Sequence, residues 1–270
     1  MWTSVLITLA SMATSAQGGP GAQEQFLEAA APTILVKYRE PTNPAYRPVC
    51  ADLKGRRLLQ KLAKVLESRQ MPRTLTLAFV GCDGVSNVWY DSEDTTVTFR
   101  CEYVAEIRRA AARYKRRKVS LRDATGGPVV FSLLHEVGHA VFDLLEVTVP
   151  GRKADAADYF ASVFLLSMGK GVAFRALEGA AWNHAQEVRA RKPDESDFAD
   201  THGLEALRYY NILCLAYGSD PETLREAAKV GHLHPERAAG CFDEFHQALF
   251  AVHKFIVPTI DAEAPEEQAP

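Results

Sequence analysis

Residues 131–142 read FSLLHEVGHAVF, and this stretch contains His135, Glu136 and His139 at the spacing HExxH. On a helix, His135 and His139 are one turn apart and lie on the same face. Two imidazoles placed in this way can both reach one Zn²⁺. Glu136 lies about 100° further round the helix, too far round to bind the same ion, and is placed to take a proton from a water that attacks a carbonyl.

The residues around this motif are almost all apolar, which predicts a buried helix. A buried helix carries two histidines and a glutamate only when each finds a partner. The same spacing also occurs by chance, and then both histidines are ordinary core or surface residues. The apolar setting favours the metal site over that alternative.

A hydrolytic zinc site needs a third protein ligand and one open position. The next segment, residues 151–160 (GRKADAADYF), opens a helix and offers the carboxylates of Asp155 and Asp158. We therefore expect the remaining ligand to come from the start of this helix.

The combination of HEVGHA with an acidic helix resembles the gluzincin-type peptidases. It is more similar still to a bacterial family of zinc metallopeptidases known as a domain of unknown function. The similarity extends over roughly residues 33 to 250 and includes four further segments: NVWYD at 87–91, FRCEY at 99–103, His202 with RYYNILC at 208–214, and Arg237 with Cys241. The resemblance implies a zincin-like fold, a zinc cofactor and a peptide or protein substrate.

The chain departs from this pattern at one place. The resemblance implies a glutamate ligand four residues before an aspartate that supports a ligand histidine, but Ala154 stands four residues before Asp158, next to the cationic Lys153. Three readings stay open: Asp155 binds the metal, Asp158 becomes a ligand itself, or the site is degenerate.

His202 and Tyr209 are the candidates for steadying the oxyanion that forms during amide hydrolysis. They are seven residues apart on a predicted helix and so share a face. The alternative is that both are packing residues. By analogy with gluzincins, the strand at 96–100 could hold an extended substrate at a sheet edge.

The composition sets limits on partners. The chain has 270 residues, a hydrophobic content of 47% and a net charge of −3, so nothing global indicates nucleic acid as a partner. The basic stretch at 108–118 is interpreted as a solvated helix face, or alternatively as a docking patch.

The first residues are typical of an export signal. Residues 2–13 are apolar and uncharged, and small residues follow, which predicts a signal peptide over 1–16. A flexible segment is expected at 17–32, one metallopeptidase-like domain at 33–257, and a disordered acidic tail at 258–270. No later stretch is long and apolar enough to span a membrane, so the sequence predicts an exported protein, periplasmic or secreted. The oligomeric state is left open.

Five cysteines suit an oxidising compartment. Proximity in sequence favours the pairs Cys82–Cys101 and Cys214–Cys241, which leaves Cys50 without a partner.

Periodicity predicts an α+β fold: a small mixed sheet packed on the HExxH helix over residues 33–128, then an active-site and helical part over 129–257. Strands are expected at 33–39, 74–80, 88–90 and 96–100, the last two as a pair, and helices at 52–68, 103–118, 129–146, 154–168, 173–191, 203–217, 221–229 and 235–255.

The function expected from the sequence is zinc-dependent hydrolysis of peptide (amide) bonds outside the cytoplasm. The alternative is a catalytically inactive zincin fold that binds a protein or peptide, with 108–118 as its contact surface. Lys153 and Ala154 favour the second, and the intact HEVGH motif favours the first.

Overall fold

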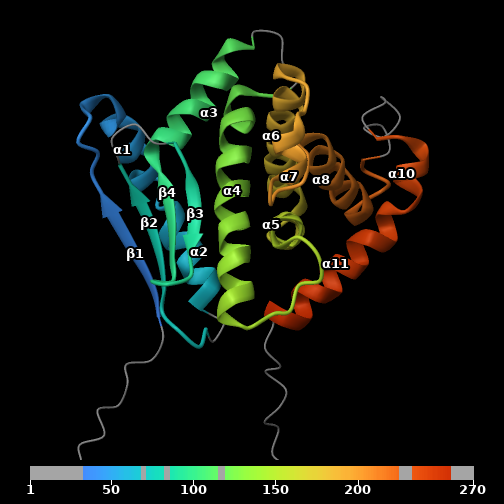
Figure 1. Ribbon diagram of the computed structural model, residues 1–270, viewed down its shortest axis with the longest axis horizontal. Coiled ribbons are helices and arrows are strands. Elements are labelled where there is room, and N and C mark those ends of the chain that lie inside the picture. The colour runs from blue at the N-terminus through green and yellow to red at the C-terminus, as the bar shows by residue number, and fades with distance from the viewer. Residues whose placement is uncertain (1–32, 68–70, 82–85, 115–118, 225–232, 257–270) are drawn as a thin grey trace, which may run out of the picture. The chain divides into compact units, whose positions relative to one another are not determined.

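The computed structural model describes residues 33–67, 71–81, 86–114, 119–224 and 233–256 (Figure 1). The predicted signal peptide, the segment at 17–32 and the acidic tail lie outside these residues, as do Cys82 and most of the helix predicted at 221–229. The boundaries of the predicted domain stay a prediction.

A four-stranded mixed sheet occupies the N-terminal part, in the order β1-β2-β4-β3. Its strands are β1 (Ile34–Arg39), β2 (Leu75–Val80), β3 (Val88–Asp91) and β4 (Thr96–Arg100). β2 runs parallel to both β1 and β4, and β3 closes the edge antiparallel to β4 with Val88 opposite Phe99. Because β4 lies between β2 and β3, the edge strands are β1 and β3, and the expectation that 96–100 forms an edge is wrong.

Helices make up most of the remainder. They are a 3₁₀ turn at Pro44–Tyr46, then α1 (Arg47–Gly55), α2 (Leu58–Glu67), α3 (Cys101–Arg113), α4 (Leu121–Leu144), α5 (Lys153–Ser167), α6 (Lys170–Ala190), α7 (Glu195–Ala199), α8 (Glu205–Ser219), α10 (Pro235–Ala239) and α11 (Cys241–Ile256).

Helix α4 stands at the centre of the fold, between the sheet and the C-terminal helices (Figure 1). It packs on β3, β4 and α3 on one side and on α5 and α6 on the other, so it is buried along most of its length. One hydrophobic core runs from the sheet through α4 into α5, α6 and α8. This arrangement explains why residues 131–142 are apolar on nearly every face.

The mixed α+β plan with a helical C-terminal part is confirmed, while its zincin-like character stays a prediction. All four strands form where the sequence predicts them. Where one helix was expected at 52–68 the structure has α1 and α2, separated at Arg57, whose φ is 53°. A helix that continues needs negative φ, so this residue ends α1.

Two disulfides connect the helices. Cys50 of α1 pairs with Cys101 at the start of α3, and Cys214 of α8 pairs with Cys241 of α11. The pair Cys214–Cys241 is confirmed. The pair Cys82–Cys101 is wrong, and so is the expectation that Cys50 is left over, because α1 packs on α3 although 51 residues separate the two cysteines.

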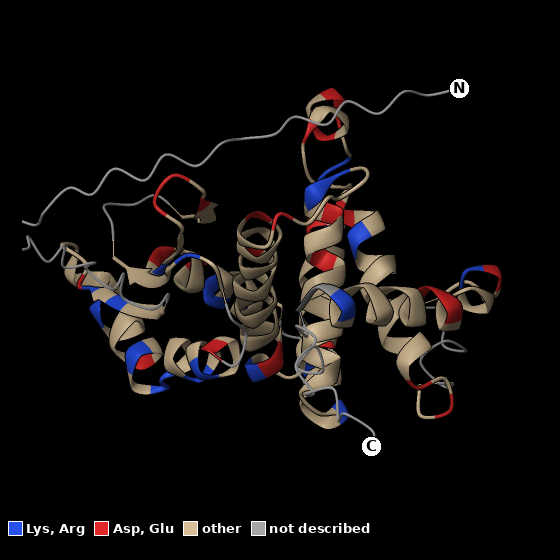
Figure 2. Cartoon of the chain, turned by 90° about the horizontal axis from the view of Figure 1, so that it is seen from below, with Lys and Arg blue, Asp and Glu red and all other residues tan. Residues whose placement is uncertain are grey.

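The charges are distributed over the whole fold. Acidic and basic residues occur on both the sheet part and the helical part, as Figure 2 shows. None of the described helices combines the length and the apolar character that crossing a bilayer requires.

Candidate active site

The close packing of α5 on α4 brings the site together. Gly138, inside the HEVGH motif, lies where a Cβ would be 3.0 Å from Phe160 Cδ1 and 3.3 Å from Ala157 Cα of α5. Glycine therefore lets the two helices approach closely at this point. The next residue on α5, Asp158, reaches His135 as a result.

The two histidines of the motif converge. Their Nε2 atoms are 3.2 Å apart and their ring centroids 4.8 Å apart. His135 Nδ1 lies 2.7 Å from Asp158 Oδ1 and donates its hydrogen to it, which leaves the lone pair of its Nε2 facing His139.

Burial keeps both histidines neutral. It lowers the pKa of His135, against the pull of the Asp158 carboxylate, and it lowers the pKa of His139 to about 4, helped by His135 and by His202. Neutral imidazole is the form that binds a metal.

Asp158 is itself held by a bidentate ion pair. Arg208 of α8 donates from Nε to Oδ2 at 2.7 Å and from Nη2 to Oδ1 at 2.9 Å. Burial alone would raise the pKa of Asp158, but Arg208 and His135 outweigh it and hold this pKa well below its usual range. The carboxylate is therefore a fixed anion behind His135.

Glu136 reaches the β3 edge of the sheet. Its Oε2 accepts a hydrogen bond of 2.9 Å from the backbone N–H of Tyr90 on β3. Burial raises the pKa of Glu136 to about 7, although this hydrogen bond and Arg208 work in the opposite direction. A carboxyl group with a pKa near neutrality suits proton transfer at neutral pH.

The other residues singled out in the sequence are placed as follows. His202, in the loop before α8, stacks on His135 with ring centroids 5.4 Å apart. Asp155, on the first turn of α5, faces Gly203 of the same loop, where a Cβ would lie 2.8 Å from its Oδ1. Ala154 is buried one turn before Asp158, and Lys153 lies close enough to His139 to lower its pKa further.

Tyr209 follows Arg208 on α8, and its described ring contact is with its neighbour rather than with the histidine pair. Its ring packs against that of Tyr210, at a centroid distance of 5.0 Å. Its neighbour Arg208 makes the contacts with Asp158 instead. Arg208 is the residue whose role the sequence did not reveal. The available signal was a cation within the otherwise apolar run of α8, since a buried guanidinium needs an acidic partner.

The spacing of His135 and His139 fits a zinc ion, but among the described residues no third side chain is placed to bind the same ion. With Zn–N distances of 2.0–2.1 Å and tetrahedral geometry, two ligand nitrogens lie about 3.3 Å apart, close to the separation of the two Nε2 atoms. Among the described residues, no three side chains of His, Cys, Asp or Glu converge closely enough to hold a metal as they stand.

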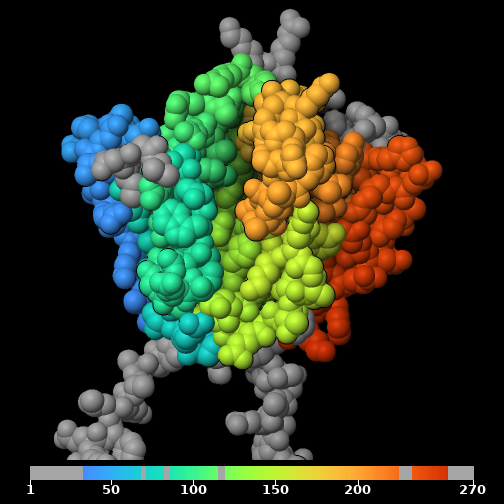
Figure 3. Space-filling model, viewed as in Figure 1, coloured from blue at the N-terminus to red at the C-terminus, as the bar shows by residue number. Residues whose placement is uncertain are grey.

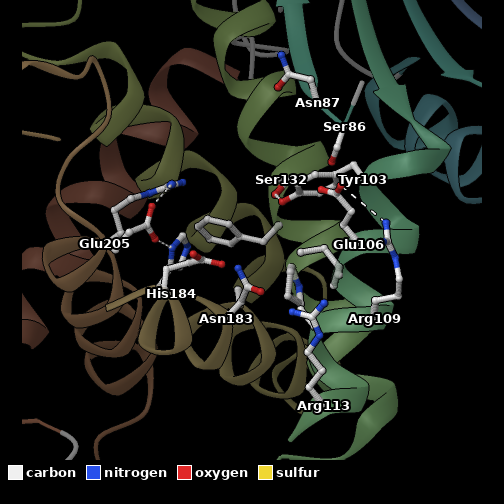
Figure 4. A pocket seen from close by; sticks show the side chains of 17 residues that line it. Ser86, Asn87, Tyr103, Glu106, Arg109, Arg113, Ser132, Asn183, His184 and Glu205 are labelled. Carbon is white, nitrogen blue, oxygen red and sulfur yellow. Dashed lines mark hydrogen bonds and ion pairs between the residues drawn. The ribbon is translucent and has the colours of Figure 1, made fainter. Parts of the chain in front are cut away.

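A polar cavity of about 580 Å³ opens beside this site. Figure 3 shows a hollow between α3 and α6, with α4 on its floor. Side chains of α3, α4, α6 and α8 and the residues before β3 line it (Figure 4). Ser132, which lines the cavity and bonds to the Tyr103 hydroxyl at 2.8 Å, stands one turn before Glu136 on α4. The cavity therefore lies next to the glutamate.

A chain of charged contacts joins the cavity to the histidine pair. His184 in the cavity wall bonds to Glu205, whose other oxygen lies 3.7 Å from Arg208. Arg208 in turn holds Asp158, which holds His135. Figure 4 shows His184 and Glu205 side by side.

Comparisons with known proteins place the chain. The model of a family described as "Putative metallopeptidase" matches residues 38–254. No curated protein and no solved structure matches the chain. The matched range contains both motif helices and the loop at His202, and it covers well over half of the sequence. The chain therefore belongs to this metallopeptidase family.

Proposed function

We propose that the protein is a zinc-dependent hydrolase of peptide (amide) bonds. The observation that carries this proposal is the 3.2 Å approach of the two Nε2 atoms, with the Nδ1 hydrogen of His135 fixed by Asp158. Histidine ligands of zinc commonly have this kind of carboxylate support. Membership of the metallopeptidase family points to the same chemistry.

Each residue of the site has a role in this proposal. His135 and His139 hold the ion, Asp158 orients His135, and Arg208 holds Asp158 in place. Zinc bound there supplies a Lewis acid that polarises a carbonyl and acidifies water. Glu136 takes the proton from the attacking water and passes it to the leaving amine.

The substrate is expected to lie along β3 and in the cavity. β3 is the sheet edge beside α4, and an extended peptide can add to such an edge through backbone hydrogen bonds. The cavity would take a polar side chain of the substrate, because arginine and glutamate side chains line it. The Tyr90 N–H binds only Oε2 of Glu136, so Oε1 can take the proton while this hydrogen bond holds the carboxylate in place.

We also propose that the protein acts after export. Two disulfides are typical of proteins that mature in oxidising compartments. The signal peptide predicted at 1–16 agrees with this interpretation.

The second candidate is a protein that binds a partner without hydrolysis. Lys153 favours it, because a cation close to His139 opposes metal binding. Ala154 favours it too, since a methyl group cannot be a ligand.

The test is metal content followed by hydrolysis. We expect close to one zinc per chain in the wild type and a large loss in His139→Ala. His246→Ala is the matched control, because His246 is an exposed histidine on α11 that bonds to the Phe242 carbonyl. Glu136→Gln should keep the zinc and lose cleavage of a fluorogenic peptide library. Absence of zinc from the wild type after zinc is added back would support the binding protein instead.

A further inference from the structure

The start of α5 offers no ligand that faces the histidine pair. Ala154 occupies the buried face one turn before Asp158, and its side chain is a methyl group. Asp155 is directed to the loop, with its Oδ1 close to Gly203. Both oxygens of Asp158 are engaged by Arg208, and one also accepts from His135. Among the described residues, neither aspartate of α5 therefore completes a metal site with the histidine pair, and another element can supply the third ligand.

The loop before α8 brings a third imidazole to the pair. The ring of His202 lies 5.4 Å from that of His135, centroid to centroid, compared with 4.8 Å between His135 and His139. Two imidazoles on one tetrahedral zinc have centroids about 5 Å apart, given Zn–N distances of 2.0–2.1 Å. Both ring distances measured from His135 are thus close to those of imidazoles that share one ion.

The surroundings of His202 prepare it for this role. Its Nδ1 lies 3.1 Å from Asp200 Oδ1, and the same oxygen accepts from the His202 backbone N–H at 2.7 Å. The carboxylate favours the hydrogen on Nδ1, which leaves Nε2 with its lone pair. Asp158 does the same for His135. Arg152, just before α5, donates to the His202 carbonyl at 3.4 Å and ties the loop to that helix.

We propose that His202 is the third protein ligand of the zinc held by His135 and His139, in place of a carboxylate from α5. This inference rests on the proposed function. The site would then consist of three imidazoles, two from one helix and one from a loop 63 residues after His139, which leaves the fourth position for water or substrate.

Metal binding requires one movement. The rings of His202 and His135 are nearly parallel, at 25°, so His202 must turn about its side-chain bonds to direct Nε2 to the ion. The side chain is 43% exposed and has room to do so. Before such a turn, the described residues contain no group of three side chains that could hold a metal.

The first experiment compares zinc affinities by competition with a chelator. Loss of an orienting partner costs about 10–100-fold in metal affinity, so loss of a ligand should cost more than about 100-fold. We expect His202→Ala to lower the zinc affinity by more than about 100-fold and Asp200→Asn to lower it by no more than about 100-fold. Asp155→Ala tests the competing ligand on α5, and it should also lower the zinc affinity by no more than about 100-fold. The melting point of each zinc-free variant controls for folding.

The second experiment needs no variant. In the wild type with ¹⁵N-labelled histidine, zinc should shift the Nε2 resonances of three rings if His202 is a ligand. Two shifted rings, or a drop of less than about 100-fold in His202→Ala, would overturn the inference. If Asp155→Ala then abolished binding, the proposed hydrolase would stand with an α5 ligand. No zinc binding by the wild type would instead remove the proposed function itself.

Discussion

At the scale of single residues, Glu136 is a buried acid whose pKa lies near neutrality. Burial beside β3 raises its pKa to about 7 from a reference value of 4.5. Between these two values the folded protein binds more protons than the unfolded chain. Stability from this group is therefore greatest at low pH and is lost as the pH rises through about 7.

This gives a pH-dependent prediction for the zinc-free protein. The lowered pKa of His139 acts in the opposite direction, so the informative quantity is the difference between wild type and Glu136→Gln. We expect the wild type to lose more free energy of unfolding than the variant between about pH 5 and pH 8. Urea denaturation across this range measures it. Glu106→Gln, an exposed change on α3, is the control and should follow the wild type.

Asp158 gives a second prediction. Asp158→Asn leaves the buried Arg208 without its anion and His135 without its acceptor. Breaking a buried pair costs about 3–5 kcal/mol, and losing the carboxylate behind a ligand costs about 10–100-fold in zinc affinity. Urea denaturation and chelator competition measure the two effects. Asp94→Asn, in the exposed turn before β4, should change stability by less than about 0.5 kcal/mol. Equal stability of both variants would contradict the role given to the Asp158–Arg208 pair.

The sequence could reveal His135, Glu136 and His139 because their relation is local: helical periodicity alone puts the two histidines on one face. It could not reveal the contact of Asp158 with Arg208, which spans 50 residues and depends on how α5 and α8 pack. His202 was a candidate from the sequence, but its distance from His135 depends on the same packing.

At the scale of helices and strands, the site depends on how closely α4 and α5 approach at Gly138. Gly138→Val would push Phe160 and the backbone of Ala157 away and so move Asp158 from His135. We expect a loss of about 1–3 kcal/mol in stability together with weaker zinc binding. Denaturation and chelator competition on the same samples measure both.

The matched control lies on the same helix. No atom lies within 4 Å of a Cβ built on Gly126, so Gly126→Ala should raise stability by about 0.5–1 kcal/mol. A Gly138→Val variant as stable as Gly126→Ala would contradict the close packing.

Strands and long helices were predictable because burial imposes a period that the sequence displays. Breaks between helices were not. Arg57 adopts a positive φ without being glycine, and Gly240 separates α10 from α11 where one helix was expected at 235–255. α4 begins at Leu121, capped by Ser120, and continues through Pro128, whereas a helix was expected only from 129. Tertiary packing decides these cases against local preference.

At the scale of the whole molecule, the disulfides show where sequence distance misleads. Cys214 and Cys241 are near each other in both sequence and space, whereas Cys50 meets Cys101 only because α1 folds against α3. A pairing inferred from sequence proximity succeeds for the first pair and fails for the second.

The Cys214–Cys241 bond joins α8, which carries Arg208, to α11. Replacing both cysteines with serine should cost about 2–4 kcal/mol in the free energy of unfolding, because the unfolded chain regains freedom. Zinc affinity should fall much less than in His139→Ala, since Arg208 keeps its ion pair with Asp158. Denaturation under non-reducing conditions measures the first effect. Unchanged stability would mean that the bond does not constrain the unfolded chain.

If the protein is the proposed hydrolase, the line of contacts from His184 through Glu205, Arg208 and Asp158 to His135 offers a way to inhibit it at a distance from the metal. Chelating compounds compete for the metal and can therefore inhibit many unrelated metalloenzymes. A compound that binds in the cavity and carries an anionic group could form an ion pair with Arg208 and so weaken its ion pair with Asp158. His135 would then be held less firmly, although the compound does not contact the ion. Selectivity would then depend on how well the compound fits the cavity wall.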